Sequence, residues 1–442
     1  MKSNQKRNSG ALVWDRAKQI IPGGNQLLSK RAEQFLPEFW PAYYQKAVGC
    51  KIQDLDSNWL RDFSIMGIGT CSLGYANPEV TAAVVNAVTN GSMCTLNCHE
   101  EVELAEALLQ LHPWSAGARF TRSGGEACSL AVRIARSFSQ KDLVMFSGYH
   151  GWHDWYLATN INDASNLNSQ LLPGLSPSGV PLALGGTAIP FHGGDSDEFD
   201  AKLSAHKGQV GVVIMEIWRY AQPDLKFISH VRKRCTEENI VLIFDEISSG
   251  FRLNIGGSHS IWGLEPDMCV LGKALGNGHP IGAVIGKKDV MNAAQSSFIS
   301  SSFWTERVGF AASLKTLEIF QRDDVATKLL SIGKTIKDGL KEIIAAGSNP
   351  IEVIGIDSVP IIVFGGDQGQ ALKTLFTQEM LKRGFLASNV IYVSIAHGPD
   401  DVAAYLTAAT EVLNILEDAI AGDINEYLDG PVSHSGFQRL TK

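Results

Sequence analysis

The sequence predicts an α/β protein whose larger domain holds a mostly parallel central sheet with helices on both faces. Between about residues 118 and 286, short apolar segments alternate with amphipathic helical segments, and this alternation is typical of parallel strands joined by crossover helices. The apolar segments are rich in β-branched and aromatic residues and are bounded by glycine or charge, as expected of strands buried on both faces. A smaller α+β domain, built from both ends of the chain, completes the prediction.

Composition narrows the classes of function. The chain has 442 residues, of which 45% are apolar and 19% are charged, and a formal net charge of −8. Nucleic-acid and anionic-membrane binding both need a basic surface, so we expect neither. No apolar run reaches the roughly 18–20 residues that span a bilayer, and residues 1–8 lack the apolar core of a secretory signal. Seven scattered cysteines predict reduced thiols and a cytoplasmic protein.

The domain boundaries are predicted from the order of these patterns. We expect residues 1–64 and 307–442 to form the small domain together, because neither part alone has enough apolar surface for a core. Residues 65–306 are expected to form the large domain. Its expected strands are 118–121, 143–146, 210–217, 241–245, 268–271 and 281–285, and its expected helices are 77–90, 99–111, 126–138 and 226–238.

The two ends of the chain show helices, a hairpin and short strands. A helix over 11–21 ends at Gly23-Gly24, a common way for helices to end, and turn residues between 51–55 and 59–63 predict a hairpin. The C-terminal part shows helices at 308–321, 325–346, 370–383 and 400–421, and strands at 351–354, 359–364 and 385–393. Residues 161–195 form an unusually long loop by their composition, which indicates a cover over a site or an interface.

Two of the expected strands end in charged side chains. The run 241–244 is followed by Asp245 and Glu246, and the run 269–272 is followed by Lys273. In open α/β sheets, ligands bind at the carboxyl ends of the strands. A lysine and an aspartate at this edge suit a pyridine-aldehyde cofactor, because the lysine forms a Schiff base and the carboxylate keeps the ring nitrogen protonated. The alternative is a buried ion pair that only holds loops in place.

Other side chains are expected at the same edge of the sheet. The turn Ser123-Gly124-Gly125 lies between a strand and a helix, where backbone amides can cradle a phosphate, although a simple tight turn also fits. Tyr149 follows a strand and offers a face on which a planar cofactor can stack. Glu216 ends another strand, and His150 is either a proton shuttle or a structural histidine. Cys94, Cys98 and His99 lack a second pair of ligands, so we expect no metal site.

Six motifs occur in an order that matches one family of enzymes. They are Ile20-Ile21-Pro22-Gly23-Gly24, Leu73-Gly74-Tyr75-Ala76-Asn77-Pro78-Glu79-Val80, Ser123-Gly124-Gly125-Glu126-Ala127, Tyr149-His150-Gly151, Phe244-Asp245-Glu246-Ile247-Ser248-Ser249-Gly250-Phe251-Arg252 and Gly272-Lys273-Ala274-Leu275-Gly276-Asn277-Gly278. With these motifs, the chain resembles the class III, or ω-type, aminotransferases of fold type I, which use pyridoxal 5′-phosphate. It looks most like glutamate-1-semialdehyde 2,1-aminomutase and its aminotransferase relatives, and the resemblance covers nearly the whole chain.

The resemblance implies roles for the matching residues. Lys273 is implied to be the Schiff-base lysine and the acid/base that moves the substrate proton. Asp245 is implied to bind the pyridine nitrogen, with Tyr149 on one ring face and Ile247 under the other. Ser123, Gly124 and Gly125 are implied to hold the phosphate, and Glu216 and His150 to support the site.

The resemblance also implies a homodimer with shared active sites. Thr305, in the segment Phe303-Trp304-Thr305-Glu306-Arg307, stands where the family has a threonine that reaches the phosphate of the neighbouring subunit. A complete site then requires two copies of the chain.

Departures from the aminomutase pattern concern the substrate. Where the aminomutases carry a carboxylate-binding arginine, this chain has Lys30, with Arg31 one residue later, and lysine cannot make the same bidentate clamp. After Glu216 comes the bulky, cationic segment Ile217-Trp218-Arg219-Tyr220. We therefore expect Lys30, Arg31, Trp218 and Arg219 to contact a larger or differently charged substrate, such as a sugar-like ketone or aldehyde.

Three functions remain open from the sequence. The leading one is an aminotransferase that moves an amino group between a small-molecule amino donor and a carbonyl acceptor. The second is an aminomutase, which performs the same chemistry within one molecule. The third is an inactive, cofactor-binding interaction protein in which Lys273 is only structural.

Overall fold

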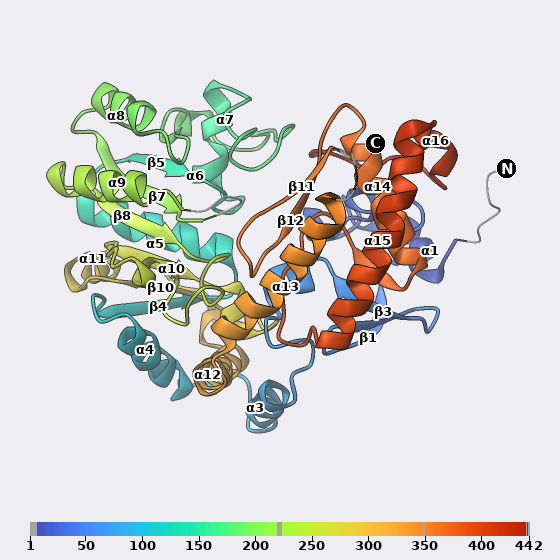
Figure 1. Cartoon of the computed structure of the whole chain (residues 1–442). Coiled ribbons are helices and arrows are strands. Elements are labelled where there is room, and N and C mark those ends of the chain that lie inside the picture. The colour runs from blue at the N-terminus through green and yellow to red at the C-terminus, as the bar shows by residue number, and fades with distance from the viewer. Residues whose placement is uncertain (1–6, 219–222, 346, 348–349, 439, 441–442) are drawn as a thin grey trace. The chain divides into compact units, whose positions relative to one another are not determined.

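The computed structural model describes residues 7–218, 223–345, 347, 350–438 and 440, and the chain folds into two compact units. Unit 1 comprises Met1–Asn77 and Lys328–Lys442, and unit 2 comprises Pro78–Thr327. Figure 1 labels their elements along the chain. The domain boundaries expected after residues 64 and 306 stay predictions. None of the described helices is long and apolar enough to cross a membrane.

Unit 2 is organised around a seven-stranded, mostly parallel sheet. The strand order is β4-β10-β9-β8-β7-β5-β6. The four pairs from β9 to β6 are parallel, and β10 is antiparallel to both of its neighbours. The strands are β4 (Gly117–Thr121), β5 (Leu143–Ser147), β6 (Ala188–Pro190), β7 (Val210–Glu216), β8 (Val241–Asp245), β9 (Met268–Leu271) and β10 (Gly282–Gly286). The predicted fold class is confirmed.

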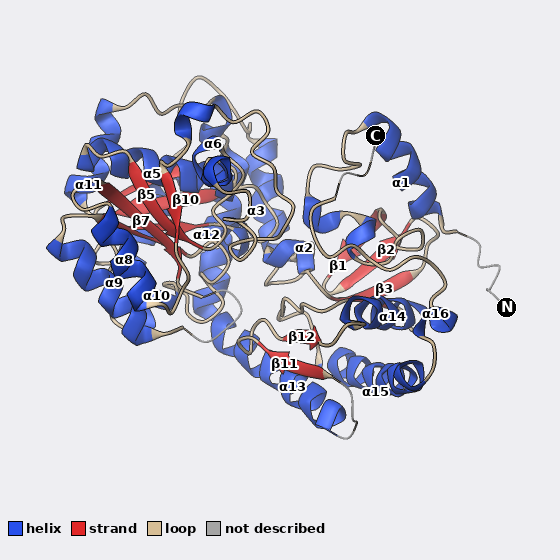
Figure 2. Cartoon of the chain, turned by 90° about the horizontal axis from the view of Figure 1, so that it is seen from above, coloured by secondary structure: helices blue, strands red, loops and turns tan. Residues whose placement is uncertain are grey.

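Helices cover both faces of this sheet (Figure 2). Side chains alternate between the faces along each strand. In β7, Val212 and Ile214 pack into the core shared with helix α5 (Gly124–Ser139). The intervening Val213 and Met215 pack into the core shared with α8 (Ser196–Ala205) and α9 (Leu225–Glu237).

The remaining helices of unit 2 are short or lie at the sheet's margins. They are α3 (Pro78–Thr89), α4 (Glu100–Leu111), α6 (Asp154–Leu157), α7 (Thr159–Asn162), η3 (Leu182–Leu184), α10 (Ser258–Ile261), η4 (Lys273–Gly276), α11 (Lys288–Asn292), η5 (Ala293–Ser296), η6 (Ser302–Thr305) and α12 (Arg307–Arg322). Helix α13 (Val325–Ala345) continues into unit 1.

The segment expected as one long loop contains regular structure. Strand β6 and the turn η3 both lie within residues 161–195. With only three residues, β6 is too short to show the alternation by which strands are recognised in a sequence. It pairs with β5 in parallel and extends the sheet at that edge.

Unit 1 joins segments from both ends of the chain. Strand β13 (Phe385–Ala387) pairs in parallel with β3 (Trp59–Phe63), the last strand of the N-terminal hairpin. The other elements are α1 (Ser9–Ile20), η1 (Leu28–Lys30), η2 (Ala32–Gln34), β1 (Tyr44–Val48), β2 (Lys51–Asp54), α2 (Met66–Gly69), β11 (Ile351–Ile354), β12 (Ile361–Phe364), α14 (Gly369–Lys382), α15 (Pro399–Ala421) and α16 (Ile424–Tyr427). The expected α+β domain built from both termini is confirmed.

One expected strand of unit 1 is shorter than predicted. Residues 385–393 read as a single strand, but only Phe385–Ala387 pair in the sheet. Beyond this point the backbone bonds elsewhere: the Ile391 amide donates to the Pro360 carbonyl, and the Tyr392 amide donates to Ser64. The apolar pattern continues because this part of the chain stays buried without being a strand.

Candidate active site

The predicted charged side chains of unit 2 meet at one edge of the sheet. Glu216 and Asp245 are opposite each other at the carboxyl ends of β7 and β8. Asp245 is also opposite Val270 of β9, and Lys273 lies two residues beyond the end of that strand. Because β10 is antiparallel to both β4 and β9, β4 runs in the same direction as β9 and brings Ser123 to the same edge. The sheet topology therefore gathers residues far apart in the sequence.

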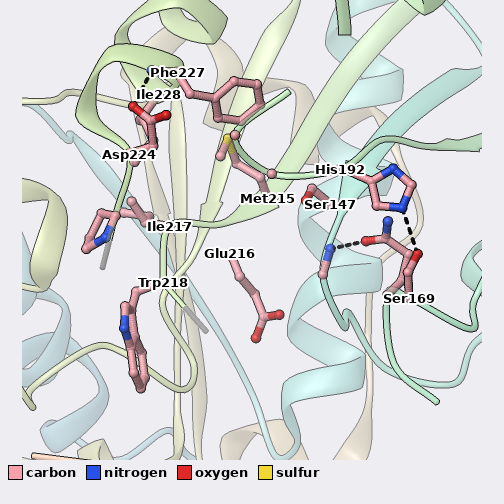
Figure 3. Close-up of a pocket in the computed structure, with 15 residues that line it drawn as sticks. Ser147, Ser169, His192, Met215, Glu216, Ile217, Trp218, Asp224, Phe227 and Ile228 are labelled. Atoms are coloured by element: carbon pink, nitrogen blue, oxygen red, sulfur yellow. Dashed lines mark hydrogen bonds between the residues drawn. The ribbon is translucent and has the colours of Figure 1, made fainter. Parts of the chain in front are cut away.

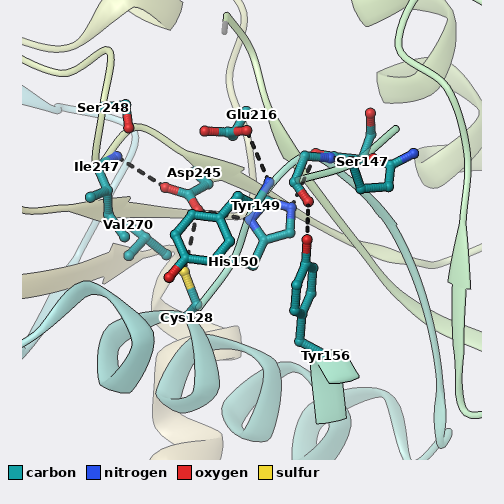
Figure 4. Close-up of polar contacts among 12 residues, drawn as sticks. Cys128, Ser147, Tyr149, His150, Tyr156, Glu216, Asp245, Ile247, Ser248 and Val270 are labelled. Atoms are coloured by element: carbon teal, nitrogen blue, oxygen red, sulfur yellow. Dashed lines mark hydrogen bonds and ion pairs between the residues drawn. The ribbon is translucent and has the colours of Figure 1, made fainter. Parts of the chain in front are cut away.

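Asp245 is a buried carboxylate held by three donors. It is only 3% exposed. Its Oδ2 lies 2.8 Å from Nδ1 of His150 and 3.3 Å from Sγ of Cys128, and its Oδ1 accepts the Ile247 amide at 3.0 Å. Figure 4 shows these side chains converging on the carboxylate. These contacts fix the orientation of the buried carboxylate.

The His150 ring donates a hydrogen bond from at least one of its two nitrogens. Its Nε2 lies 3.1 Å from the Ser147 carbonyl oxygen, which can only accept, so Nε2 carries a proton. Its Nδ1 faces a carboxylate oxygen, which requires a second proton between the ring and Asp245.

Glu216 orders the loop that follows β5. Its Oε2 accepts the backbone N–H of Tyr149 at 3.0 Å. The Tyr149 ring packs edge-on against Tyr156, with centroids 6.1 Å apart, and remains 39% exposed. The Tyr156 hydroxyl donates to the Gly148 carbonyl at 2.9 Å. Tyr149 is thus fixed at the backbone while its ring keeps an accessible face.

Lys273 is held in an unusual backbone conformation. Its φ is 44°, in the left-handed region that side-chain-bearing residues rarely adopt. Its Nζ donates to Oγ of Ser248 at 2.6 Å. Strained backbone of this kind persists only where the surrounding structure enforces it, and it concentrates at functional sites.

The glycine turn at the start of α5 packs tightly against neighbouring loops. A Cβ on Gly124 would lie 2.9 Å from Cδ1 of Ile247, and one on Gly151 would lie 2.7 Å from the Cα of Gly125. Ser123 caps the helix, because its hydroxyl accepts from the Glu126 amide and the Glu126 carboxylate accepts from the Ser123 amide. Glycine is needed here so that the turn, Ile247 and the loop after β5 can approach one another.

This turn suits a phosphate. Among the described residues, no acceptor is hydrogen bonded to the amides of Gly124 and Gly125, and amides at a helix N-terminus favour an anion. The buried carboxylate of Asp245 suits a protonated ring nitrogen, and the amine of Lys273 suits an aldehyde. The residues present therefore fit a pyridine-aldehyde phosphate.

Glu246 has a different role from its neighbour Asp245. It is fully buried, and its carboxylate accepts hydrogen bonds from Ser249, from the amides and side chains of Ser258 and His259, and from no other described residue. Burial raises its pKa, but the bonds from His259 and Ser258 outweigh that effect and lower the pKa to about 2. Glu246 therefore anchors the loop 246–259 beneath the site.

The other predicted site residues are not among the contacts described above. Thr305 is exposed on η6, where its hydroxyl donates to the Ser302 carbonyl at 3.2 Å. Lys30 and Arg31 belong to unit 1, where the Arg31 guanidinium donates to the Gln438 carbonyl at 3.0 Å. Arg219 lies outside the described residues. The roles of all four stay predictions.

Trp218 lies beside a cavity at the ends of β5 and β7. The cavity has a volume of about 340 Å³, and Figure 3 shows Trp218 and Glu216 on one side of it and His192 and Ser169 on another. Trp218 is only 4% exposed. Carboxylate, amide, imidazole and hydroxyl groups line the cavity, including Ser147, Ser169, Gln170, His192 and Glu216.

Two contacts of the site were not predicted. Ser248 belongs to a predicted motif without a predicted role, although its position next to Ile247 is a signal that it faces the same crevice. Cys128 is predicted only as one of the seven reduced thiols, and its spacing of four residues from Gly124 on a helix is the signal that places both on one face. In the structure, these side chains contact Lys273 and Asp245 respectively.

Comparisons with known proteins agree with this geometry. The family description "Aminotransferase class-III" matches residues 37–356. The 3-aminobutyryl-CoA aminotransferase of Cloacimonas acidaminovorans is 29% identical over 91% of this chain and 95% of its own length. The glutamate-1-semialdehyde 2,1-aminomutase of Methanopyrus kandleri is 31% identical over 91% of this chain and 97% of its own length.

A solved structure with the same fold has the cofactor bound. The FumI protein of Sphingopyxis sp. MTA144, in its PLP internal aldimine form, superimposes with a TM-score of 0.85 and is 25% identical. The match covers 93% of this chain and 97% of that one.

The role of Glu246 predicts a pH-dependent stability difference. Since its folded pKa is about 2, below the ordinary value of 4.5, its contribution is complete above pH 4.5 and is lost as the pH falls toward 2. Replacing Glu246 with Gln should cost on the order of 3 kcal/mol near neutral pH, because an amide cannot accept all of these bonds. Thermal unfolding midpoints measured from neutral pH down to about pH 2 check this, and the difference between the two proteins should shrink below pH 4.5.

The matched control is Glu265→Gln, which changes an exposed carboxylate of the same unit. Its midpoint should follow that of the unaltered protein at every pH. The structural role of Glu246 is wrong if Glu246→Gln unfolds at the same temperature as this control.

Proposed function

The chain belongs to the class III aminotransferase family, and from this premise we propose that Lys273 and Asp245 are the catalytic residues of an intermolecular aminotransferase. The enzyme depends on pyridoxal 5′-phosphate, as the family and the cofactor-bound FumI protein indicate. The observation that carries the proposal is the convergence of the Lys273 amine, the buried Asp245 carboxylate and the glycine turn at one edge of the sheet.

Different residues of the site are proposed to bind different parts of the cofactor. When bound, the cofactor supplies an electron sink for the carbanion that forms when a substrate Cα–H is broken. Asp245 holds a proton on the ring nitrogen, the amides of Gly124 and Gly125 receive the phosphate, and Tyr149 and Ile247 cover the two ring faces. His150 supports Asp245 through the bond at 2.8 Å.

Lys273 is placed to hold the cofactor's aldehyde through its amine and to move a proton on the substrate. When this amine is not bonded to the cofactor, the Ser248 hydroxyl would hold it. The bond from Nζ to Ser248 Oγ at 2.6 Å shows that this position is within reach. A tethered amine stays close to the substrate carbon, which general acid–base catalysis requires.

The carbonyl acceptor that we propose is a hydroxyl-rich, sugar-like ketone or aldehyde. The cavity beside Glu216 is lined by apolar side chains such as Phe227 and Ile228 and also by groups that hydrogen bond to hydroxyls, such as Ser169 and His192. Lys30 stands where the aminomutases have their carboxylate-binding arginine, which favours a transferase over an intramolecular mutase. Lys30, Arg31, Trp218 and Arg219 are proposed substrate contacts.

A homodimer in the cytoplasm is part of the proposal. Exposed apolar side chains lie along residues 298–305 and next to them, and include Trp152, Phe298 and Phe303, with Phe298 88% exposed. Two neighbouring hollows share Ile299, Ser300 and Trp304, so this surface is continuous. Apolar patches of this kind usually mark an interface. None of the seven cysteines, all described, forms a disulfide, which supports a reducing compartment.

The first test concerns Lys273. Lys273→Ala should abolish the visible absorbance of lysine-bound cofactor and reduce amino transfer by roughly 10²–10⁴-fold, because no other group is proposed to bond the aldehyde. Absorbance spectra with and without added pyridoxal 5′-phosphate measure this. The exposed Lys288→Ala serves as the control and should keep both properties, and a coloured, active Lys273→Ala would disprove the assignment.

The second test separates a transferase from a mutase. With an amino donor alone, a single turnover should bleach the visible band and leave the protein stalled in the amino form of the cofactor until a carbonyl acceptor is added. Stopped-flow absorbance over a panel of donors and acceptors measures this. Full conversion of one substrate without any acceptor would show a mutase, and a protein that takes up no cofactor would contradict the proposed function.

The third test concerns the dimer. Phe298→Glu should weaken dimerisation by roughly 100-fold, because a buried, unpaired carboxylate costs several kcal/mol, and cofactor affinity should fall with it when Thr305 of the neighbouring subunit is lost. Sedimentation and cofactor titration measure the two effects. Ile261→Glu, at a half-exposed apolar residue of α10, should remain dimeric. A monomeric Phe298→Glu with unchanged cofactor affinity would contradict the shared site.

A further inference from the structure

Cys128 contacts the carboxylate that is proposed to bind the cofactor. It lies on the buried face of α5, and its Sγ is 3.3 Å from Oδ2 of Asp245, as Figure 4 shows. Burial, and then the negative charge of Asp245, raise the pKa of the Cys128 thiol well above its usual value. The sulfur therefore keeps its proton and acts as a hydrogen-bond donor.

The two carboxylate oxygens of Asp245 accept different numbers of hydrogen bonds. An ionised carboxylate has about four acceptor positions, two on each oxygen. Among the residues that the structure describes, His150 and Cys128 take the two positions on Oδ2, and the Ile247 amide is the one donor to Oδ1. With respect to these residues, one acceptor position remains, and it is on Oδ1.

We propose that Cys128 is a positioning residue for the cofactor: with His150, its thiol holds Oδ2 of Asp245, so that the ionised carboxylate presents Oδ1 to the ring nitrogen. This inference rests on the proposed function, in which Asp245 faces that nitrogen. The thiol does not touch the cofactor and acts only through Asp245.

The competing interpretation is that Cys128 only fills space. It belongs to the apolar core between α5 and the sheet, together with Ala127 and Ala131. A packing role and a donor role predict different affinities for Cys128→Ser, which keeps a hydrogen-bond donor, and for Cys128→Ala, which does not. The two roles also predict different effects on ligands with and without a ring nitrogen.

The experiment compares two ligands that form no covalent bond with Lys273. Calorimetry on the cofactor-free, full-length protein measures the affinity for pyridoxamine 5′-phosphate and for its analogue in which a C–H group replaces the ring nitrogen. The proteins are the unaltered chain, Cys128→Ser, Cys128→Ala and, as a matched control, Cys235→Ala, which removes another fully buried thiol from α9.

The preference for the nitrogen-containing ligand is the decisive quantity. We expect Cys128→Ala to reduce this preference by roughly fivefold, the worth of one hydrogen bond, and Cys128→Ser and Cys235→Ala to keep it within about twofold. Equal weakening of both ligands by Cys128→Ala shows a packing role and overturns the inference. The inference is also overturned if Cys128→Ser and Cys128→Ala show the same preference for the nitrogen-containing ligand.

Failure of the proposed function gives a different pattern. If the unaltered protein binds neither ligand, the proposed cofactor site is wrong. If it binds both ligands equally well, Asp245 does not face the ring nitrogen. The inference about Cys128 alone fails when the unaltered protein prefers the nitrogen-containing ligand and Cys128→Ala keeps that preference in full.

Discussion

The candidate site depends on keeping an ionised carboxylate inside the protein at Asp245. Removing such a charge from water costs several kcal/mol unless donors compensate for it, and here His150, Ile247 and Cys128 supply them. This requirement explains the course of the loop after β5, which brings the His150 imidazole to the Asp245 carboxylate. It also explains the close approach of Gly151 to Gly125, because a side chain there would push that loop away from α5.

Asp245 and Glu246 show how neighbouring acids acquire different functions. Both are buried, but the hydrogen bonds of Glu246 come from the loop that it anchors, and these bonds leave it no role toward a ligand. Asp245 retains one acceptor position at the edge where ligands bind. The number and direction of the donors around each acid therefore separate the catalytic candidate from the structural one.

Much of the fold and part of the site could be predicted from the sequence. Asp245 and Lys273 were recognisable because each follows a buried apolar strand, and strand ends of a parallel sheet share one edge. Strand β6 was missed because three residues show no pattern. The contacts of Cys128 and His150 with Asp245 join positions 117 and 95 residues apart, and no local pattern reports such pairs. The roles of Lys30 and Arg31 stay predictions.

A crystal structure of the protein loaded with pyridoxal 5′-phosphate tests the central claim most directly. The account predicts that Lys273 Nζ is bonded to the cofactor and that the ring nitrogen lies within hydrogen-bond distance of Asp245 Oδ1, while His150 and Cys128 remain on Oδ2. A ring nitrogen that faces another group, or an Asp245 carboxylate turned so that Oδ2 faces the ring, would contradict it.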